Sequence, residues 1–346
     1  MIPKINIKPK KNLKKINIVI FGHGKPVLYF YNLSKKFQNV KIIYVITHKK
    51  KYHYHDIKNL SKYKNIYENI FNHLDKFKIL QIKQISDNLL NLLNRKKVNL
   101  IISCGSRVKF NSRIIEKFKN RIFNFHPSYL PEERGGANFT YRLLSNKNHI
   151  SATLHKISSK IDEGDILFQK KIKKKQISLI EMFEKTYSLY NIFFIKLINK
   201  ILKNKKIKFK KQQNNMATLN PKILSKINGA IDWSWKIDDI QKFIHAFGPP
   251  YSGAFTFLNK NKLEILKSNI YKKEKCHPFN KGRVYKILND KTTLIHCVDG
   301  ILKIKTIRFK RRIISPNKIL RLSDRLFTPI NILERSLNDK NKINFG

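Results

Sequence analysis

The chain of 346 residues is poor in cysteine, and its three cysteines are far apart. They are Cys104, Cys276 and Cys297, and no two of them form a C-x-x-C pair. Zinc sites use cysteines in such pairs, and disulfide scaffolds use many cysteines in a short chain. We therefore expect no metal site, no disulfide framework and a reducing, cytoplasmic setting.

Long apolar runs are missing as well. No segment approaches the roughly 18 uninterrupted apolar residues of a membrane-spanning helix. The basic leader, residues 1–15, is not followed by the apolar core of a signal peptide. The sequence predicts an unexported protein without a membrane span, and it specifies no oligomeric state.

Acidic residues are scarce, with 22 Asp and Glu against 73 Lys and Arg, which gives a formal net charge of +51. Such a positive charge favours the binding of polyanions such as nucleic acid. However, lysine, isoleucine and asparagine recur evenly along the whole chain, as AT-rich codon usage produces. We attribute most of the charge to codon usage and keep a selected polyanion surface as the alternative.

What is present indicates a globular protein of two domains, with 41% hydrophobic and 11% aromatic residues. Short β-branched runs occur at residues 16–24, 40–47 and 98–105, and polar stretches of helical period lie around them. This alternation predicts an α/β fold with a Rossmann-like, mainly parallel sheet.

Further along, residues 149–158 and 164–174 predict a hairpin around "SKIDEG", and residues 178–202 predict a long helix with Ser178 and Glu181 as a capping box. Residues 203–221 are polar and charged, and short alternating runs follow them. We therefore predict a first domain at residues 16–202, a linker at 203–221 and a β-rich, OB-like barrel domain at 222–340.

The stretch "FGHG" after the first predicted strand is a weak nucleotide-binding signal. The pattern G-x-G-x-x-G needs glycine at position 27, where Val27 stands, and no acidic residue follows the second predicted strand. We interpret the two glycines as a tight turn.

Asn124 and His126 are two positions apart at the end of a predicted strand, so their side chains point to the same face. With Asp162 beside them, they would supply an amide donor for an oxyanion, an imidazole for a proton and a carboxylate to orient it, which suits acyl transfer to an amine. The alternative is structural: a turn cap, a polar residue before Pro127, and an Asx turn with Gly164.

The surrounding sequence is more specific. "NFHPSYLPEERGG" (residues 124–136) resembles the N-x-H-x-S-x-L-P-x-x-R-G signature of formyltransferases that use 10-formyltetrahydrofolate, and "IDEGDIL" resembles their D-x-G turn. Residues 227–258 are similar to the segment that opens the C-terminal barrel of methionyl-tRNA formyltransferases and some sugar formyltransferases.

The resemblance implies formyl transfer from 10-formyltetrahydrofolate, as co-substrate, to a primary amine. It implies that Asn124 hydrogen-bonds the formyl oxygen, that His126 assists proton removal, and that Asp162 holds His126. It also places the folate against a set of residues from the preceding loop and the D-x-G turn, which are Arg107, Val108, Phe110, Ile161 and Asp162.

The acceptor is where this chain departs from the tRNA enzymes, because an R-G-A-A-P run is absent after the histidine. We favour a nucleotide-linked amino sugar, with methionyl-tRNA as the alternative and a non-catalytic nucleic-acid-binding protein as the second alternative. Arg134 and Gly135 are the predicted substrate-binding residues, and a salt bridge to Glu132 or Glu133 is the other interpretation of Arg134. Trp233 and Trp235 are predicted core anchors between the domains, against a base-stacking role.

Overall fold

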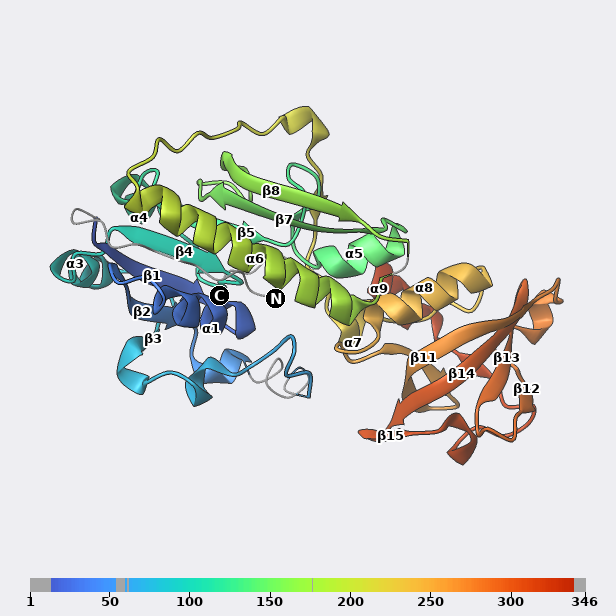
Figure 1. The fold of residues 1–346 in the computed structure, drawn as a ribbon. Coiled ribbons are helices and arrows are strands. Elements are labelled where there is room, and N and C mark those ends of the chain that lie inside the picture. Colours follow the sequence, from blue (N-terminus) through green and yellow to red (C-terminus); the bar gives the residue numbers. More distant parts are fainter. Residues whose placement is uncertain (1–13, 54–59, 61, 176, 339–346) are drawn as a thin grey trace.

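The computed structural model describes residues 14–53, 60, 62–175 and 177–338. They build a larger α/β lobe, blue to green in Figure 1, and a smaller β lobe in orange and red. The predicted basic leader, residues 1–15, lies almost entirely outside the described residues. Among the helices of the described ranges, none combines the length and the apolar character that crossing a bilayer requires.

The larger lobe contains a seven-stranded sheet in the order β3–β2–β1–β4–β5–β7–β8. The strands from β3 to β5 are parallel, and β7 and β8 join antiparallel at one edge, which confirms both the mainly parallel sheet and the predicted hairpin. The bounds are β1 (Ile16–Gly22), β2 (Val40–Thr47), β3 (Ile79–Gln81), β4 (Leu100–Cys104), β5 (Ile122–His126), β7 (His149–Lys156) and β8 (Ile166–Lys173).

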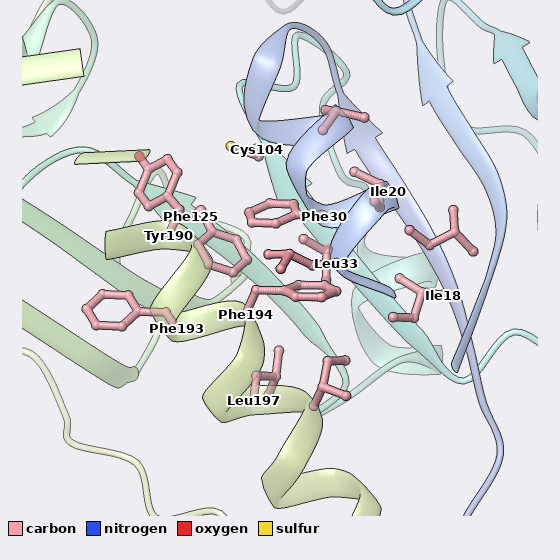
Figure 2. Packing of buried hydrophobic residues seen from close by; sticks show 14 of the residues in the cluster. Ile18, Ile20, Phe30, Leu33, Cys104, Phe125, Tyr190, Phe193, Phe194 and Leu197 are labelled. Carbon is pink, nitrogen blue, oxygen red and sulfur yellow. The ribbon is translucent and has the colours of Figure 1, made fainter. Parts of the chain in front are cut away.

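Helices cover both faces of this sheet because its central strands are apolar on both sides. Ile18 and Ile20 of β1 pack with Phe30 of α1 and Phe194 of α6, as Figure 2 shows, whereas Val19 packs on the opposite face in the cluster that contains α3 and α4. The helices of this lobe are α1 (Lys25–Ser34), α3 (Asp87–Arg95), α4 (Ser112–Lys117), α5 (Asn138–Leu144) and α6 (Leu179–Leu202).

The long helix α6 begins where the sequence predicts. The hydroxyl of Ser178 accepts a hydrogen bond from the backbone N–H of Glu181 at 3.2 Å, which is one half of the predicted capping box. The Glu181 carboxylate pairs with Lys174, so the reciprocal half of the box is replaced by an ion pair to the end of the hairpin.

The smaller lobe is an antiparallel sheet in the order β12–β13–β14–β11–β10–β16, with β15 paired to β14. A single bridge between Arg283 and Arg325 joins its two edges, so the sheet is a partly closed barrel. The bounds are α7 (Ser225–Asn228), α8 (Ile237–Phe247), β10 (Ala254–Leu258), β11 (Asn261–Lys273), β12 (Val284–Ile287), β13 (Thr293–Cys297), β14 (Gly300–Phe309), β15 (Arg312–Ile314), β16 (Leu326–Phe327) and α9 (Ile330–Asn338).

Both tryptophans belong to the core of this lobe. Trp233 is buried and its indole N–H donates to Thr256 Oγ1 at 2.9 Å, while the Trp235 ring packs on Phe243 at 5.0 Å. They are core residues as predicted, in a cluster of the smaller lobe against which Leu143 and Leu144 of α5 also pack.

The segment between the lobes runs back along the edge of the sheet near β8 (Figure 1). Lys210 exchanges two backbone hydrogen bonds with Ile166, at 2.8 and 2.9 Å. Strand β9 (Leu219–Asn220) then pairs in parallel with β6 (Arg134–Gly135). The predicted linker is therefore hydrogen-bonded to the larger lobe, while the domain boundaries 16–202, 203–221 and 222–340 stay a prediction.

Candidate active site

A cavity of about 380 Å³ lies at the carboxyl edge of the parallel sheet. It is lined by the ends of β4, β5 and β7 and by the loops that follow them. The strand order reverses between β1 and β4, and open α/β sheets bind ligands beside such a reversal. The predicted catalytic residues Asn124, His126 and Asp162 all line this cavity.

The carboxylate of Asp162 is the centre of the site. Its Oδ2 accepts a hydrogen bond from the backbone N–H of Gly135 at 3.0 Å, and its Oδ1 accepts from Asn124 Nδ2 at 3.3 Å. Two imidazoles flank it, with His126 Nδ1 at 3.4 Å from Oδ2 and His155 Nε2 at 3.4 Å from Oδ1. Asp162 thus connects three segments of the lobe and does not form the alternative Asx turn with Gly164.

The electrostatics keep this carboxylate ionised. Burial by itself raises the pKa of Asp162, but His126, His155 and the Gly135 N–H together outweigh it, so the pKa lies below its ordinary value. A buried negative charge therefore stands beside both imidazoles at neutral pH.

His126 is buried at the end of β5, and each of its ring nitrogens has partners. Nε2 lies 3.0 Å from the carbonyl oxygen of Glu133 and 3.0 Å from Asn138 Nδ2, so it donates to the first when protonated and accepts from the second when not. Nδ1 faces Asp162. Both neutral tautomers and the imidazolium are therefore accommodated, which suits a residue that takes up and returns a proton.

Burial lowers the pKa of His126, and the charge of Asp162 opposes the shift without cancelling it. The imidazole is consequently neutral at pH 7 and able to accept a proton. Uptake at Nδ1 creates an ion pair with Asp162, so the carboxylate stabilises the protonated form.

His155 is a site residue that the sequence analysis missed. Its Nδ1 lies 2.6 Å from the carbonyl oxygen of Lys156, and its Nε2 lies 3.2 Å from Asn124 Nδ2 and 3.4 Å from Asp162 Oδ1. The antiparallel register of β5 and β7 places His155 directly opposite Asn124. Only that register, which the sequence did not reveal, could have identified it.

The structure separates the predicted folate-side residues. Val108, Phe110, Ile161 and Asp162 line the cavity. Arg107 is exposed on the same loop and is not among the described residues that line it. The loop is held by Ser106, whose hydroxyl accepts from the backbone N–H of Val108 at 3.1 Å.

Arg134 and Gly135 take different places. The Arg134 side chain is buried, and its guanidinium donates to Glu163 at 3.0 Å and to Gln212 and Asn214 of the linker. The alternative salt bridge to Glu132 or Glu133 is wrong, because Glu163 is the acid within reach. Gly135 lines the cavity and presents its N–H to Asp162.

Glu133 belongs to a buried ion pair that no sequence signal indicated. Arg142 of α5 is fully buried and donates to Glu133 Oε2 at 2.6 Å and to the carbonyl oxygen of Pro127 at 2.8 Å. Burial raises the pKa of Glu133, but the positive charges of Arg142 and Lys147 lower it by more, so the pKa lies below its ordinary value. The pair fixes both ends of the loop after His126.

In the part of the chain that is described, no cluster of three or more His, Cys, Asp or Glu residues is arranged to hold a metal ion.

Comparisons with known proteins find matches to one protein family in both lobes. The family model "Formyl transferase" matches residues 14–185, and "Formyl transferase, C-terminal domain" matches residues 223–323. A protein named methionyl-tRNA formyltransferase from Treponema denticola is 30% identical over 202 residues, which are 57% of this chain and 61% of that protein. Its namesake from Caldicellulosiruptor saccharolyticus is 30% identical over 220 residues, 62% of this chain and 68% of that protein. This chain thus spans less than two thirds of the Treponema relative.

Among solved structures, the N-formyltransferase of Helicobacter canadensis in complex with folinic acid and dTDP-3-aminofucose has the same fold. It superposes with a TM-score of 0.59 at 21% identity, covering 84% of this chain and 98% of that one.

Proposed function

The chain belongs to the formyl transferase family over both of its domains, and from this premise we propose that it transfers a formyl group from 10-formyltetrahydrofolate to a primary amine. The observation that carries the proposal is the convergence of Asn124, His126 and Asp162 on one cavity. Val108, Phe110 and Ile161 supply its apolar wall for the folate.

The residues divide the reaction between them. The neutral amine attacks the formyl carbon, the carbonyl electron pair moves to oxygen, and the amide of Asn124 stabilises that oxyanion. The contacts of Asn124 Nδ2 with Asp162 and His155 are long, at 3.3 and 3.2 Å, so one N–H can turn toward the formyl oxygen. His126 accepts the proton that the amine loses, and Asp162 stabilises the resulting imidazolium. Cleavage of the bond to N10 and return of the proton to that nitrogen yield a formamide and tetrahydrofolate.

An assay of tetrahydrofolate release with mixed amine acceptors tests the reaction. Asn124→Ala and His126→Ala should each lower turnover by about 10²- to 10³-fold, since one oxyanion donor or one general base is commonly worth about that much. Near-normal rates in both variants would remove the assignment. Salt-dependent RNA binding without any tetrahydrofolate release would favour the non-catalytic alternative.

For the acceptor we propose a nucleotide-linked amino sugar. The loop after Arg134 reads "RGGANF" and lacks the R-G-A-A-P run of the tRNA enzymes, and the Helicobacter canadensis protein was crystallised with an amino-sugar nucleotide. The names of the sequence relatives and the net charge of +51 favour methionyl-tRNA as the second candidate.

A competition assay decides between the two. The purified enzyme is offered initiator methionyl-tRNA together with a panel of 3- and 4-amino-sugar nucleotides. We expect a sugar nucleotide to be formylated preferentially. Efficient formylation of the tRNA alone would overturn this choice and leave the chemistry at Asn124, His126 and Asp162 intact.

A further inference from the structure

Both the nitrogen and the oxygen of the Gln212 side-chain amide, in the linker, form hydrogen bonds with residues around the candidate site. Its Nε2 donates to the backbone carbonyl oxygens of Asp162 at 2.7 Å and Gly164 at 2.8 Å. Its Oε1 accepts from Arg134 Nε at 3.2 Å and Nη2 at 2.9 Å. Gln213, the next residue, is exposed, and its side chain caps no backbone N–H of the turn that follows it. Two adjacent glutamines thus have contrasting environments.

The turn that Gln212 binds needs external support. Asp162 has φ 52, a left-handed conformation that residues with a Cβ atom seldom adopt. Gly164 lets this turn pass close to β7, because a Cβ atom there would lie 1.9 Å from the carbonyl oxygen of Lys156. The direction of the Asp162 carboxylate depends on this backbone, and two of the carbonyls that define it are held by Gln212.

The same linker holds the opposite side of the carboxylate. The backbone N–H of Glu133 donates to Thr218 Oγ1 at 2.8 Å, and β6 pairs with β9. These contacts place the Gly135 N–H, which donates to Asp162 Oδ2. Arg134 links the turn to the linker, because its guanidinium donates to both Glu163 and Gln212.

We infer that Gln212 is a positioning residue, which holds the Asp162 turn so that its carboxylate lies between His126 and His155. The inference rests on the proposed formyl transfer for its kinetic consequence and on the contacts above for its geometry. The segment that leads into the second domain is therefore part of the active site's support.

Three variants of the full chain test this role: Gln212→Ala, Gln212→Glu and the matched control Gln213→Ala. Gln212→Glu keeps an oxygen for Arg134 and loses the N–H groups for Asp162 and Gly164. If the hold on the turn matters, both Gln212 variants should lower kcat by about 10- to 100-fold, as small misplacements of catalytic groups do, with KM for the folate nearly unchanged. Gln213→Ala should behave as the wild type.

A second measurement needs no turnover. The ring of His126 is titrated by NMR in the absence of substrates, with its resonance assigned by comparison with His126→Gln. Because Asp162 raises the pKa of His126, Gln212→Ala, which adds no charge, should lower that pKa relative to the wild type and to Gln213→Ala. This titration tests the positioning role even if the wild type transfers no formyl group. A lack of transfer would contradict the proposed function alone.

Wild-type kcat in Gln212→Glu together with an unchanged His126 titration in Gln212→Ala would overturn the inference, since Gln212 would then serve only as a tether for Arg134. A loss of melting temperature in Gln212→Ala without a change in the His126 titration would overturn it equally.

Discussion

At the residue scale, one buried carboxylate organises the candidate site. Asp162 receives hydrogen bonds from Gly135 and Asn124 and stands between His126 and His155. These neighbours come from three segments, β5, β6 and β7, so the carboxylate fixes the relative positions of those segments. The arrangement lowers the pKa of Asp162 and leaves His126 neutral but next to an anion.

The first prediction concerns the pH dependence of the rate. His126 must be neutral to accept a proton, so kcat/KM should rise with pH as this group loses its proton. The groups facing it are Asp162, which raises its pKa, and His155 and Arg142, which add to the lowering by burial. The midpoint of the rise should therefore lie below the ordinary value of about 6.5. A rise centred above that value in a pH–rate profile would contradict the assignment of His126.

The second prediction concerns the buried pair of Arg142 and Glu133. Arg142→Met leaves the Glu133 carboxylate buried without its main partner, which should lower the free energy of unfolding by about 3 to 5 kcal/mol. The double variant Arg142→Met with Glu133→Gln should recover part of the loss, because no unpaired charge remains.

Urea denaturation followed by circular dichroism measures these differences. Lys147→Met is the control, since Lys147 is 38% exposed and binds the same carboxylate at 3.2 Å. Its removal should cost no more than about 1 kcal/mol. If Arg142→Met and Lys147→Met lowered the free energy of unfolding equally, the buried ion pair would contribute no more to stability than the exposed one.

At the scale of elements, strand pairings that bring distant segments together make the site. The antiparallel pair β5–β7 sets Asn124 against His155, and the short parallel pair β6–β9 presents Gly135 to Asp162. Neither pairing involves neighbouring segments of the chain.

The third prediction tests the β6–β9 pair through its glycines. Gly135 has φ 87, and a Cβ atom there would lie 2.3 Å from the carbonyl oxygen of Asn220. Gly135→Ala should therefore destabilise the protein by more than about 1 kcal/mol and lower turnover, because it separates β6 from β9.

Gly136→Ala is the matched control, because the nearest atom to a Cβ at that position is Lys222 Cα at 3.5 Å. It should change the melting temperature little. Thermal denaturation of both variants compares them, and equal effects would indicate that β9 yields to the added methyl group.

At the scale of the whole molecule, two lobes are joined by a segment that is hydrogen-bonded to the larger of them. Helix α5 adds a direct contact between the lobes, where Thr140 Oγ1 donates to the carbonyl oxygen of Ala246 at 3.3 Å. Leu143 and Leu144 of α5 pack against the core of the smaller lobe. The linker and α5 therefore both relate the second domain to the site.

The fourth prediction is that trypsin separates the domains within Lys203–Lys208. The lysines 203, 205, 206 and 208 are exposed, and no strand pairing begins before Lys210, which is hydrogen-bonded to Ile166. Mass spectrometry of the first products should locate the cut there rather than at Lys210 or Lys222. Stable fragments divided near residue 100 would contradict the two-domain organisation.

The sequence by itself determined the fold class and the three catalytic candidates. Periodicity depends on local backbone geometry, so the strands, the hairpin and the helix that starts after Ser178 were predictable from residue order. Asn124 and His126 share a face because two residues span one strand repeat. The signature around them then indicated the family and, through it, Asp162.

Only the tertiary structure decided which groups surround these candidates. The places of His155, Arg142 and Gln212 depend on strand register, on burial and on the return path of the linker, which are contacts between segments distant in sequence. Arg134 shows the difference most clearly. Its sequence neighbours Glu132 and Glu133 were the expected acids, yet the fold directs its guanidinium to Glu163 and Gln212. A side chain pairs with the groups that the folded backbone brings within its reach, and proximity along the chain does not determine those groups.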